Sequence, residues 1–370
     1  MNRSHLNIIL VLSIVFLIAC SKEQNTNPNE LVLQLPENLY NYSDQDLPAH
    51  FSESTALSLF ENLASHPEVT DNGATLGRVL FYDQALSVNN SVSCASCHQQ
   101  KFAFSDPRNL SIGHNSAFTA RHSMSLANML WERRFFWDNR TNGLTNQILE
   151  PIQDRNEMGM HLDSLEVKIQ ELPYYQSLFQ AAFGDSLVTS DRISDAIAQF
   201  CLSMISSKSK YDIGFYNDFA NFSESEKRGK DLFFNGDTRC NQCHMTALFY
   251  NTTAVNSGLD LDEDKGLFNA TGNPEHIGLF QVPSLRNIEV TAPYMHDARF
   301  QTLDEVLEFY DHGVQTAPNL DDRITVNFQT GGTPIELNLS PQDKQDLIAF
   351  MKTLTDIEFL TDQKFSNPFK

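Results

Sequence analysis

Basic residues are scarce in this 370-residue sequence, which has 26 Lys and Arg against 47 Asp and Glu and a formal net charge of −21. An acidic chain is repelled by a phosphate backbone, which argues against nucleic acid as a partner. A protein partner steered by charge would be basic. The acidity equally fits a chain that uses its charge only for solubility, and composition does not choose between the two.

Cysteines that could form a structural disulfide are also lacking. One cysteine ends an N-terminal apolar run, four form two closely spaced pairs, and one lies alone in the apolar helical stretch "ISDAIAQFCLSMI". The lone thiol, Cys201, is expected to be buried and inert. The six cysteines are Cys20, Cys94, Cys97, Cys201, Cys240 and Cys243.

The N-terminal apolar run "LNIILVLSIVFLIAC" is too short to span a membrane comfortably. It follows Arg3 and ends in Leu-Ile-Ala-Cys, which resembles a bacterial lipobox. We therefore predict a lipoprotein signal peptide over 1–19, a lipid anchor on Cys20 and a polar tether over 20–45. An uncleaved anchor, or a chance cysteine after a simple signal peptide, are the alternatives. All three predict export, and we expect a periplasmic protein held on a bacterial membrane.

Each of the two cysteine pairs is followed directly by a histidine, in the motifs Cys-x-x-Cys-His. This spacing is typical of c-type haem attachment, in which two thiols bond the haem vinyl groups and the imidazole ligates the iron. A structural zinc site is the rival interpretation, but it does not explain a histidine after both pairs. The sequence therefore predicts two covalently bound c-type haems on Cys94, Cys97, Cys240 and Cys243, with His98 and His244 as iron ligands.

The segments before the two motifs form a weak internal repeat, "LGRVLFYD" and "RGKDLFF". Each places a Gly four residues before a Phe, so that both lie on one helix face where another element can approach closely. Ser223 and Glu226 form a capping box at the start of the second helix. Near the C-terminus Ser340 caps a helix with an apolar stripe, namely Leu347, Phe350, Met351 and Leu354.

Strand signals are few and short, for instance "RITVNF" and "PIELNL". The expected fold class is therefore mainly α, with two cytochrome c-like domains that each bind one haem. The stretch "YNDFANFSESE" is the best candidate boundary. We predict an N-terminal haem domain over 46–218 and a C-terminal haem domain over 219–370.

From about Leu76 to Leu354 the chain resembles the bacterial di-haem cytochrome c peroxidases and their relative MauG. Two CxxCH motifs alone would fit many electron carriers, but here several further motifs occur in order. They are "LFYD", "SIGH", "RHSMSLAN", "RFFWDNR", "EPIQDRNEMG", "VPSLRNIEVTAPYMHDARF" and "LEFYDHG". The resemblance implies that the N-terminal haem meets hydrogen peroxide, while the C-terminal haem receives electrons from a small donor protein such as a cytochrome c.

The resemblance also implies roles for residues around the first haem. His98 matches the proximal ligand, and His114 matches the histidine that blocks the distal side in resting peroxidases. Glu157 matches the distal acid–base catalyst, and Trp137 matches the tryptophan that helps electron transfer between the haems. The alternatives are a surface loop position for His114 and a plain core position for Trp137.

Around the second haem the sequence departs from the peroxidases, which commonly have a Met where this chain has Tyr310. MauG also has a Tyr ligand there. Met295, His312 or a water-filled site are the rivals of Tyr310 as distal ligand. The family holds a calcium ion between the haems, and Thr291 and Pro293 keep part of that motif. His122 stands at the position of the calcium-binding Asn, and imidazole is a poor ligand for calcium, so the sequence leaves calcium open.

The sequence thus predicts a di-haem cytochrome c peroxidase that reduces hydrogen peroxide to water. One rival is a MauG-like oxidase acting on a protein substrate, which Tyr310 favours whereas His114 favours the peroxidase. The other rival is a non-catalytic di-haem electron carrier. A homodimer stays open, because the family peroxidases are often dimers and no dimer face is identifiable in these residues. The remaining histidines, His50, His66, His161 and His276, are expected at the surface.

Overall fold

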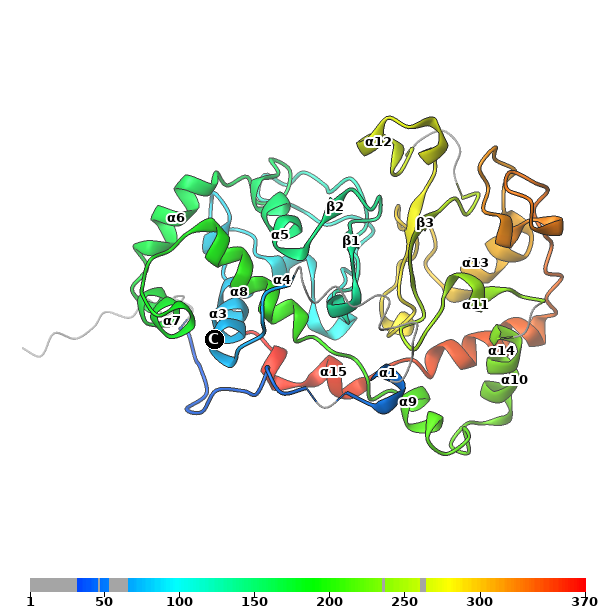
Figure 1. Ribbon diagram of the computed structural model, residues 1–370, viewed down its shortest axis with the longest axis horizontal. Helices are drawn as coiled ribbons and strands as arrows, with labels where there is room; N and C mark the ends of the chain where they lie inside the picture. The colour runs from blue at the N-terminus through cyan, green and yellow to red at the C-terminus, as the bar shows by residue number, and fades with distance from the viewer. Residues whose placement is uncertain (1–31, 46, 53–65, 235–236, 260–263) are drawn as a thin grey trace, which may run out of the picture.

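A computed structural model of the protein describes residues 32–45, 47–52, 66–234, 237–259 and 264–370. Cys20 and the predicted signal peptide lie outside the described residues. Helices dominate the two lobes seen side by side in Figure 1, which confirms the mainly α class. Within the described ranges, no helix is both long and apolar enough to cross a bilayer.

The first lobe is built on the crossing of α3 (Asp71–Tyr82) and α8 (Ser190–Leu202). A Cβ atom at Gly77 would overlap the backbone carbonyl of Ala196, so only glycine allows the two helices to lie this close. One helix turn further along, the rings of Phe81 and Phe200 lie 5.4 Å apart. The predicted role of the Gly–Phe pair in the first half of the repeat is confirmed.

The second lobe repeats this crossing with α10 (Glu224–Phe234) and α14 (Pro341–Lys352). A Cβ atom at Gly229 would overlap the backbone carbonyl of Asp346, and Phe233 packs 5.2 Å from Phe350. The predicted capping box forms, because the backbone N–H of Ser223 donates to the Glu226 carboxylate. Ser340 caps α14 as predicted, and its backbone N–H also donates to the Asp343 carboxylate, which completes a second capping box. The predicted apolar stripe of α14 and Leu354 is buried.

The remaining helices surround these two crossings, and the four strands of the described residues form two antiparallel ribbons. The strands are β1 (Arg134–Phe135) with β2 (Thr141–Asn142), and β3 (Asn251–Val255) with β4 (Phe280–Val282). The helices are α1 (Ala49–Ser52), α4 (Cys94–Cys97), α5 (Leu144–Gln153), α6 (Leu162–Gln170), α7 (Pro173–Phe183), α9 (Lys210–Phe215), α11 (Cys240–Cys243), α12 (Phe268–Thr271), α13 (Leu303–Glu308) and α15 (Ile357–Thr361).

The expected strands over "RITVNF" and "PIELNL" do not form. The first segment lies in two short 3-10 helices, Asp322–Ile324 and Val326–Phe328, and a single bridge between Thr325 and Pro334 joins it to the second. Asn327 has a φ of 63°, in the left-handed region, which breaks the extended conformation in the middle of the segment. The β-branched residues of these two segments were therefore not sufficient to predict strands.

The C-terminal tail runs back from α14 to the first lobe, as the red segments of Figure 1 show. Phe359 and Phe365 belong to the core of the first lobe. The Tyr42 hydroxyl donates to the carbonyl of Lys364 over 2.7 Å, and Val32 and Lys370 exchange backbone hydrogen bonds. Any polar tether therefore ends before Val32. The predicted division at residues 218 and 219 stays a prediction, but the tail of the second part packs on the first lobe.

Candidate haem and peroxide site

A single cavity of about 440 Å³ is lined by both lobes and by both CxxCH motifs. Most of its lining is apolar side chain, which suits a hydrophobic macrocycle. The α4 and α11 turns bring the six predicted haem-attachment residues to its wall. These are Cys94, Cys97, His98, Cys240, Cys243 and His244.

The two predicted proximal histidines are oriented in the same way. The Nδ1 atom of His98 lies 2.8 Å from the carbonyl oxygen of Phe104, and Nδ1 of His244 lies 3.1 Å from that of Phe249. Both phenylalanines have a left-handed φ, 59° and 55°, which aims their carbonyls at the rings. When Nδ1 donates to a carbonyl, Nε2 carries the lone pair that a metal needs. Burial also lowers the pKa of both imidazoles, that of His244 to about 4, which favours the neutral ligand form.

The thiols and imidazoles fit two c-type haems. All five cysteines in the described residues are free thiols, so both CxxC pairs are available for bonding. Burial raises the pKa of Cys94 to about 12 and the pKa of Cys97 and Cys243 to about 11. Cys201 is buried as predicted, and it too lines the cavity.

Glu157 lines the cavity on the side of the first CxxCH motif. It follows α5 in a turn, where its backbone N–H donates to the carbonyl of Asp154 over 3.0 Å. Its carboxylate is close enough to Cys94 and Cys97 to raise the pKa of both thiols. Burial, assisted by the charge of Asp154, raises the pKa of Glu157 itself to about 7. A carboxyl group is thus present beside the first cysteine pair.

His114 lies next to Glu157 but its ring does not line the cavity. The backbone N–H of His114 donates to the carbonyl of Glu157 over 2.7 Å, while its ring Nε2 lies 3.0 Å from the carbonyl of Arg155. In this conformation the imidazole is engaged with the Arg155 carbonyl and is not part of the cavity wall. The ligand role predicted for His114 in the resting state stays a prediction.

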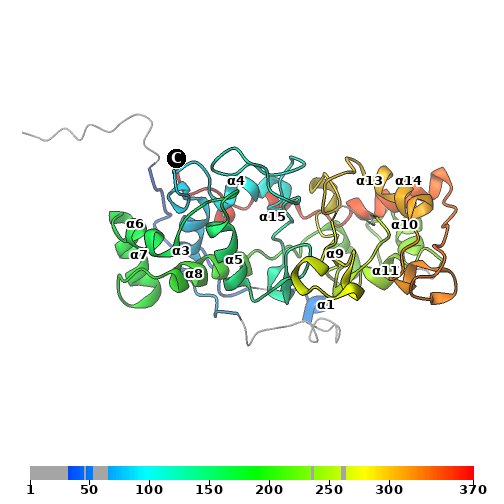
Figure 2. The ribbon, with the colours of Figure 1, turned by 90° about the horizontal axis from the view of Figure 1, so that it is seen from above.

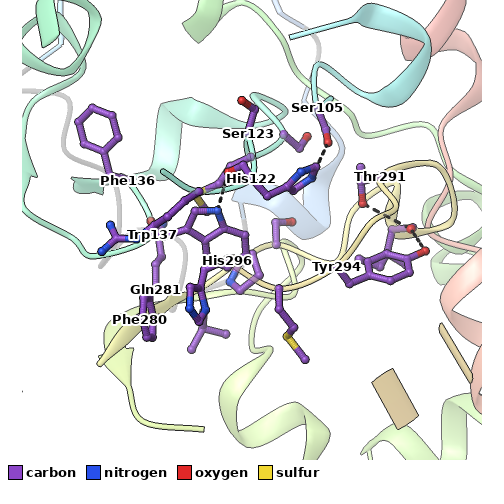
Figure 3. Close-up of a pocket in the computed structure, with 18 of the residues that line it drawn as sticks. Ser105, His122, Ser123, Phe136, Trp137, Phe280, Gln281, Thr291, Tyr294 and His296 are labelled. Atoms are coloured by element: carbon purple, nitrogen blue, oxygen red, sulfur yellow. Dashed lines mark hydrogen bonds between the residues drawn. The ribbon is translucent and has the colours of Figure 1, made fainter. Parts of the chain in front are cut away.

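Trp137 lines the cavity next to His122 and His296 (Figure 3). Its indole N–H donates to the carbonyl of His122 over 2.8 Å, and its ring lies 6.4 Å from that of His296. The His296 ring stacks at 3.8 Å on Phe280, a residue of β4. One hydrogen bond to the backbone and one ring contact therefore hold the indole in place.

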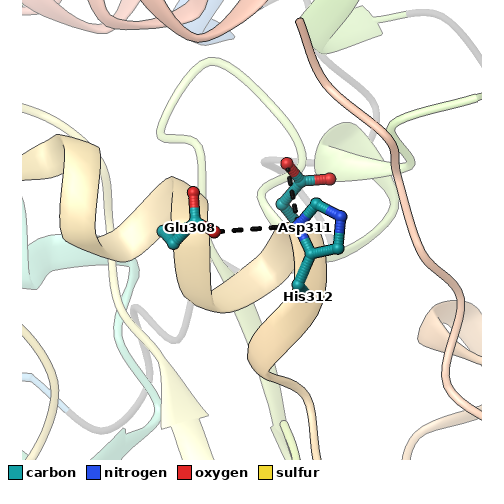
Figure 4. Close-up of side chains that lie close together, drawn as sticks. All are labelled: Glu308, Asp311 and His312. Carbon is teal, nitrogen blue, oxygen red and sulfur yellow. Dashed lines mark ion pairs between the residues drawn. The ribbon is translucent and has the colours of Figure 1, made fainter. Parts of the chain in front are cut away.

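Of the three side chains predicted as rivals at the second haem, Tyr310 and Met295 line the cavity and His312 does not. Burial raises the pKa of the Tyr310 phenol, and the two thiols Cys240 and Cys243 raise it further. The ring of His312 is 49% exposed and its Nδ1 lies 3.2 Å from the Asp311 carboxylate (Figure 4). The structure therefore brings Tyr310, and not His312, beside the second cysteine pair.

The residues of the predicted calcium motif, Thr291 and Pro293, also line the cavity. His122 is buried, with its ring nitrogens 3.3 Å from the Ser105 hydroxyl and 3.3 Å from the carbonyl of Asn109. Its ring is thus engaged within the first lobe (Figure 3). Calcium binding at this position stays a prediction.

Two buried polar groups escaped the sequence analysis. Glu132 lines the cavity at 7% exposure, accepts a 2.7 Å hydrogen bond from Gln281, and has a pKa raised by burial to about 8. His50, expected at the surface, is only 5% exposed and lies 2.8 Å from the Asp212 carboxylate. No local signal identifies either residue, because their partners lie far away in the sequence.

Comparison with known proteins agrees with this site. A family profile described as di-haem cytochrome c peroxidase matches residues 71–218. MauG of Methylophilus methylotrophus is 32% identical over 286 residues, 76% of this chain and 82% of that protein. Cytochrome c551 peroxidase of Nitrosomonas europaea is 29% identical over 324 residues, 84% of this chain and 88% of that protein.

Among solved structures, a MauG-like protein associated with microbial copper homeostasis is 32% identical. It superposes with a TM-score of 0.74 and covers 90% of this chain and 99% of its own. The order of motifs, the shared cavity beneath two CxxCH turns and these relatives lead to one conclusion. The chain belongs to the family of di-haem cytochrome c peroxidases and MauG proteins.

Proposed function

We propose that this protein is a di-haem peroxidase that reduces hydrogen peroxide to water with two electrons from a small donor protein such as a cytochrome c. The observation that carries the proposal is the position of Glu157 on the cavity wall beside Cys94 and Cys97. A haem iron bound there would supply the binding site for peroxide and the electrons that cleave its O–O bond. The protein must then move protons at the same place.

Glu157 is suited to move these protons. Its carboxylate takes the proton that peroxide loses on binding and returns it to the departing oxygen, which leaves as water. The nearby apolar lining limits competing water, so the carboxyl group is the main proton carrier at this wall. The overall reaction consumes two electrons and two protons for each peroxide and yields two waters.

The second motif, with Cys240, Cys243 and His244, would receive electrons from the donor. Trp137 lines the cavity that both motifs share and is held by its hydrogen bond to the carbonyl of His122. An aromatic ring in that place shortens the tunnelling gap between two electron carriers. We therefore assign Trp137 to electron transfer from the second haem to the first.

A set of visible and EPR spectra tests this function against its rivals. They are recorded on the oxidised protein, the half-reduced protein and the protein after stoichiometric peroxide. A high-spin haem that appears only on half-reduction identifies a peroxidase. An open haem that gives a long-lived peroxide product without donor identifies a MauG-like oxidase, and two unreactive low-spin haems leave only an electron carrier.

The MauG-like oxidase is the second candidate, because Tyr310 lies beside the second cysteine pair and the His114 ring contacts the Arg155 carbonyl outside the cavity lining. A phenolate ligand would stabilise ferric iron and make reduction by a donor cytochrome harder. Such a protein would act on a protein substrate instead of taking electrons from a carrier.

Replacing Tyr310 with Phe is expected to remove a ligand from the second haem and change its visible and EPR spectra, while the first haem is unaffected. Tyr310→Met should instead raise the potential of the second haem, because a thioether favours ferrous iron. Met295→Leu serves as the control and should leave both spectra unchanged. The reverse pattern, with Met295→Leu altering the spectrum, would assign the ligand to Met295.

The double variant Cys240→Ala/Cys243→Ala is expected to keep one covalent haem out of two. The reason is that, among the described residues, each CxxC pair supplies the two thiols beside its proximal histidine. The one further thiol on the cavity wall in these residues is that of Cys201, near Cys94. Haem staining on a denaturing gel and a pyridine haemochrome titration against protein mass measure the stoichiometry. Cys201→Ala is the matched control and should keep two haems.

Export, a lipid on Cys20 and a periplasmic location are parts of the same proposal, supported by the lipobox-like sequence. Cys20→Ser should abolish lipidation, measured as the loss of labelled fatty acid from the protein, because no thiol is left to be modified. Calcium and a homodimer also belong to the proposal as features of the family. Metal analysis of the holoenzyme and its mass in solution by light scattering decide these two points.

A further inference from the structure

Tyr216 stands out among the tyrosines because its ring is exposed. All ten tyrosines of the chain fall within the described residues, and Tyr216, at 58%, is the exposed member of the set. It directly follows α9, where α1 lies alongside in both views of the fold (Figures 1 and 2). A reductant in solution can reach this phenol directly.

A proton acceptor, the ring of His50, lies within hydrogen-bond distance of the Tyr216 hydroxyl. The hydroxyl accepts a hydrogen bond from the backbone N–H of His50 over 3.2 Å and lies 3.1 Å from the ring Nδ1 of the same residue. On the far side of that ring, Nε2 lies 2.8 Å from the carboxylate of Asp212. Because the Tyr216 oxygen already accepts from a backbone N–H, its own proton is free to point at Nδ1.

Asp212 determines which nitrogen of His50 carries the proton. Arg286 and Ser209 donate to this buried carboxylate, and the guanidinium of Arg286 holds the pKa of Asp212 well below its usual range. An ionised Asp212 is an acceptor, so Nε2 of His50 donates to it and Nδ1 is left as the acceptor for the phenol. A proton moved from Tyr216 to His50 would thus be stabilised by the Asp212 charge.

A row of aromatic rings leads from this hydrogen-bonded group to the haem cavity. The ring of His50 lies 5.5 Å from that of Tyr216 and 4.9 Å from that of Phe51, and Phe51 lies 5.5 Å from Trp131. Trp131 is buried and is not itself part of the cavity wall, but its near neighbours in the sequence, Met129 and Glu132, both line the cavity. The two oxidisable residues at the ends of this row are Trp131 and Tyr216.

Trp131 and Tyr216 differ in whether they can lose a proton when they are oxidised. The indole N–H of Trp131 is buried and has no hydrogen-bond acceptor among the described residues. Oxidised Trp131 therefore keeps its proton and remains a strong oxidant. Tyr216 can lose its proton to His50 as it loses an electron, which gives a neutral tyrosyl radical. The radical therefore remains on Tyr216 and does not return to Trp131.

We propose that Tyr216 is a second site of electron entry, at which a phenolic reductant in solution is oxidised through the path Tyr216–His50–Phe51–Trp131. The inference rests on the proposed peroxidase function, because hydrogen peroxide is the oxidant. Trp131 would give one electron to the haem in the cavity after peroxide has oxidised it. Trp131 then takes one electron from Tyr216, while the phenolic proton moves to Nδ1 of His50. The reductant then gives one electron to Tyr216 and its proton to solvent, and His50 returns its proton. Two such events reduce one peroxide to two waters.

Freeze-quench EPR on the holoenzyme after stoichiometric peroxide, with no donor protein, tests this path. A tyrosyl radical signal is expected in the wild type and in Tyr174→Phe, but not in Tyr216→Phe. Tyr174 is the matched control, since its hydroxyl has a proton acceptor of its own, the Asp83 carboxylate, at 2.6 Å. Peroxide-dependent oxidation of a small phenol such as guaiacol should fall by about 10²-fold in His50→Gln, because the amide cannot take up the proton. Oxidation of a donor cytochrome should remain unchanged in Tyr216→Phe.

An experiment without peroxide separates this inference from the peroxidase function. Photogenerated ruthenium(III) oxidises exposed tyrosines from solution, and Tyr216 should react faster in the wild type than in His50→Gln. Equal rates would overturn the proposed role of His50 even if the haems do not react with peroxide. Normal cytochrome peroxidation without a Tyr216 radical would overturn the path and leave the peroxidase function standing. Trp131→Phe should abolish the peroxide-generated radical but not the ruthenium reaction, and a radical that survives it excludes Trp131.

Discussion

Replacing Glu157 with Gln is expected to slow peroxide reduction by about 10²- to 10⁴-fold, the contribution of a positioned acid–base group. The amide fills the same space on the cavity wall but can neither take the proton from bound peroxide nor return it to the departing oxygen. Both haems should remain attached, because the cysteines and proximal histidines are untouched. Stopped-flow mixing of the half-reduced holoenzyme with peroxide measures the effect directly.

The matched control is Glu171→Gln, which makes the same chemical change at an exposed position outside the cavity. Its peroxide reaction should equal that of the wild type. Full activity in Glu157→Gln would rule out Glu157 as proton carrier and point to another group. In that event the variant Glu132→Gln comes next, since Glu132 is the other buried carboxyl on the wall with a raised pKa.

Gly77→Ala and Gly229→Ala are each expected to destabilise the folded protein by about 3 kcal/mol, at the upper end of what overpacking usually costs. The added methyl group would overlap a backbone carbonyl, that of Ala196 or Asp346, and backbone cannot rotate away as a side chain can. The helices α3 and α8, or α10 and α14, would have to separate. The loss exceeds the gain of about 1 kcal/mol in helix propensity that Ala brings over Gly.

The midpoint of urea unfolding, followed by far-UV circular dichroism on the holoenzyme, measures this change. Asn72→Ala is the control, since Asn72 is exposed on the same helix as Gly77 and gains helix propensity without a clash. An unchanged or raised midpoint in both glycine variants would show that the helices tolerate the extra volume. The tight crossing would then be no constraint on the fold.

Much of the site could be predicted from the sequence because its chemistry lies within short segments. A CxxCH turn carries two thiols and an imidazole on consecutive residues, so no tertiary information is needed to recognise it. The Gly–Phe pairs, the Ser223–Glu226 capping box and the Ser340 N-cap act over three or four residues along a helix, and they form as predicted. The position of Glu157 came from its resemblance to a family motif rather than from any local pattern.

The sequence by itself determined the mainly α class, the two haem-attachment turns and the repeated helix that precedes them. Only the tertiary structure decided that the C-terminal tail packs on the first lobe and that the His114 ring turns toward Arg155. It also decided that His50 is buried, because its partner Asp212 lies 162 residues further along the chain. The physical reason is the distance along the chain over which each interaction acts. Covalent spacing and helix periodicity depend on neighbours in sequence, whereas burial and charge pairing depend on which distant segments meet.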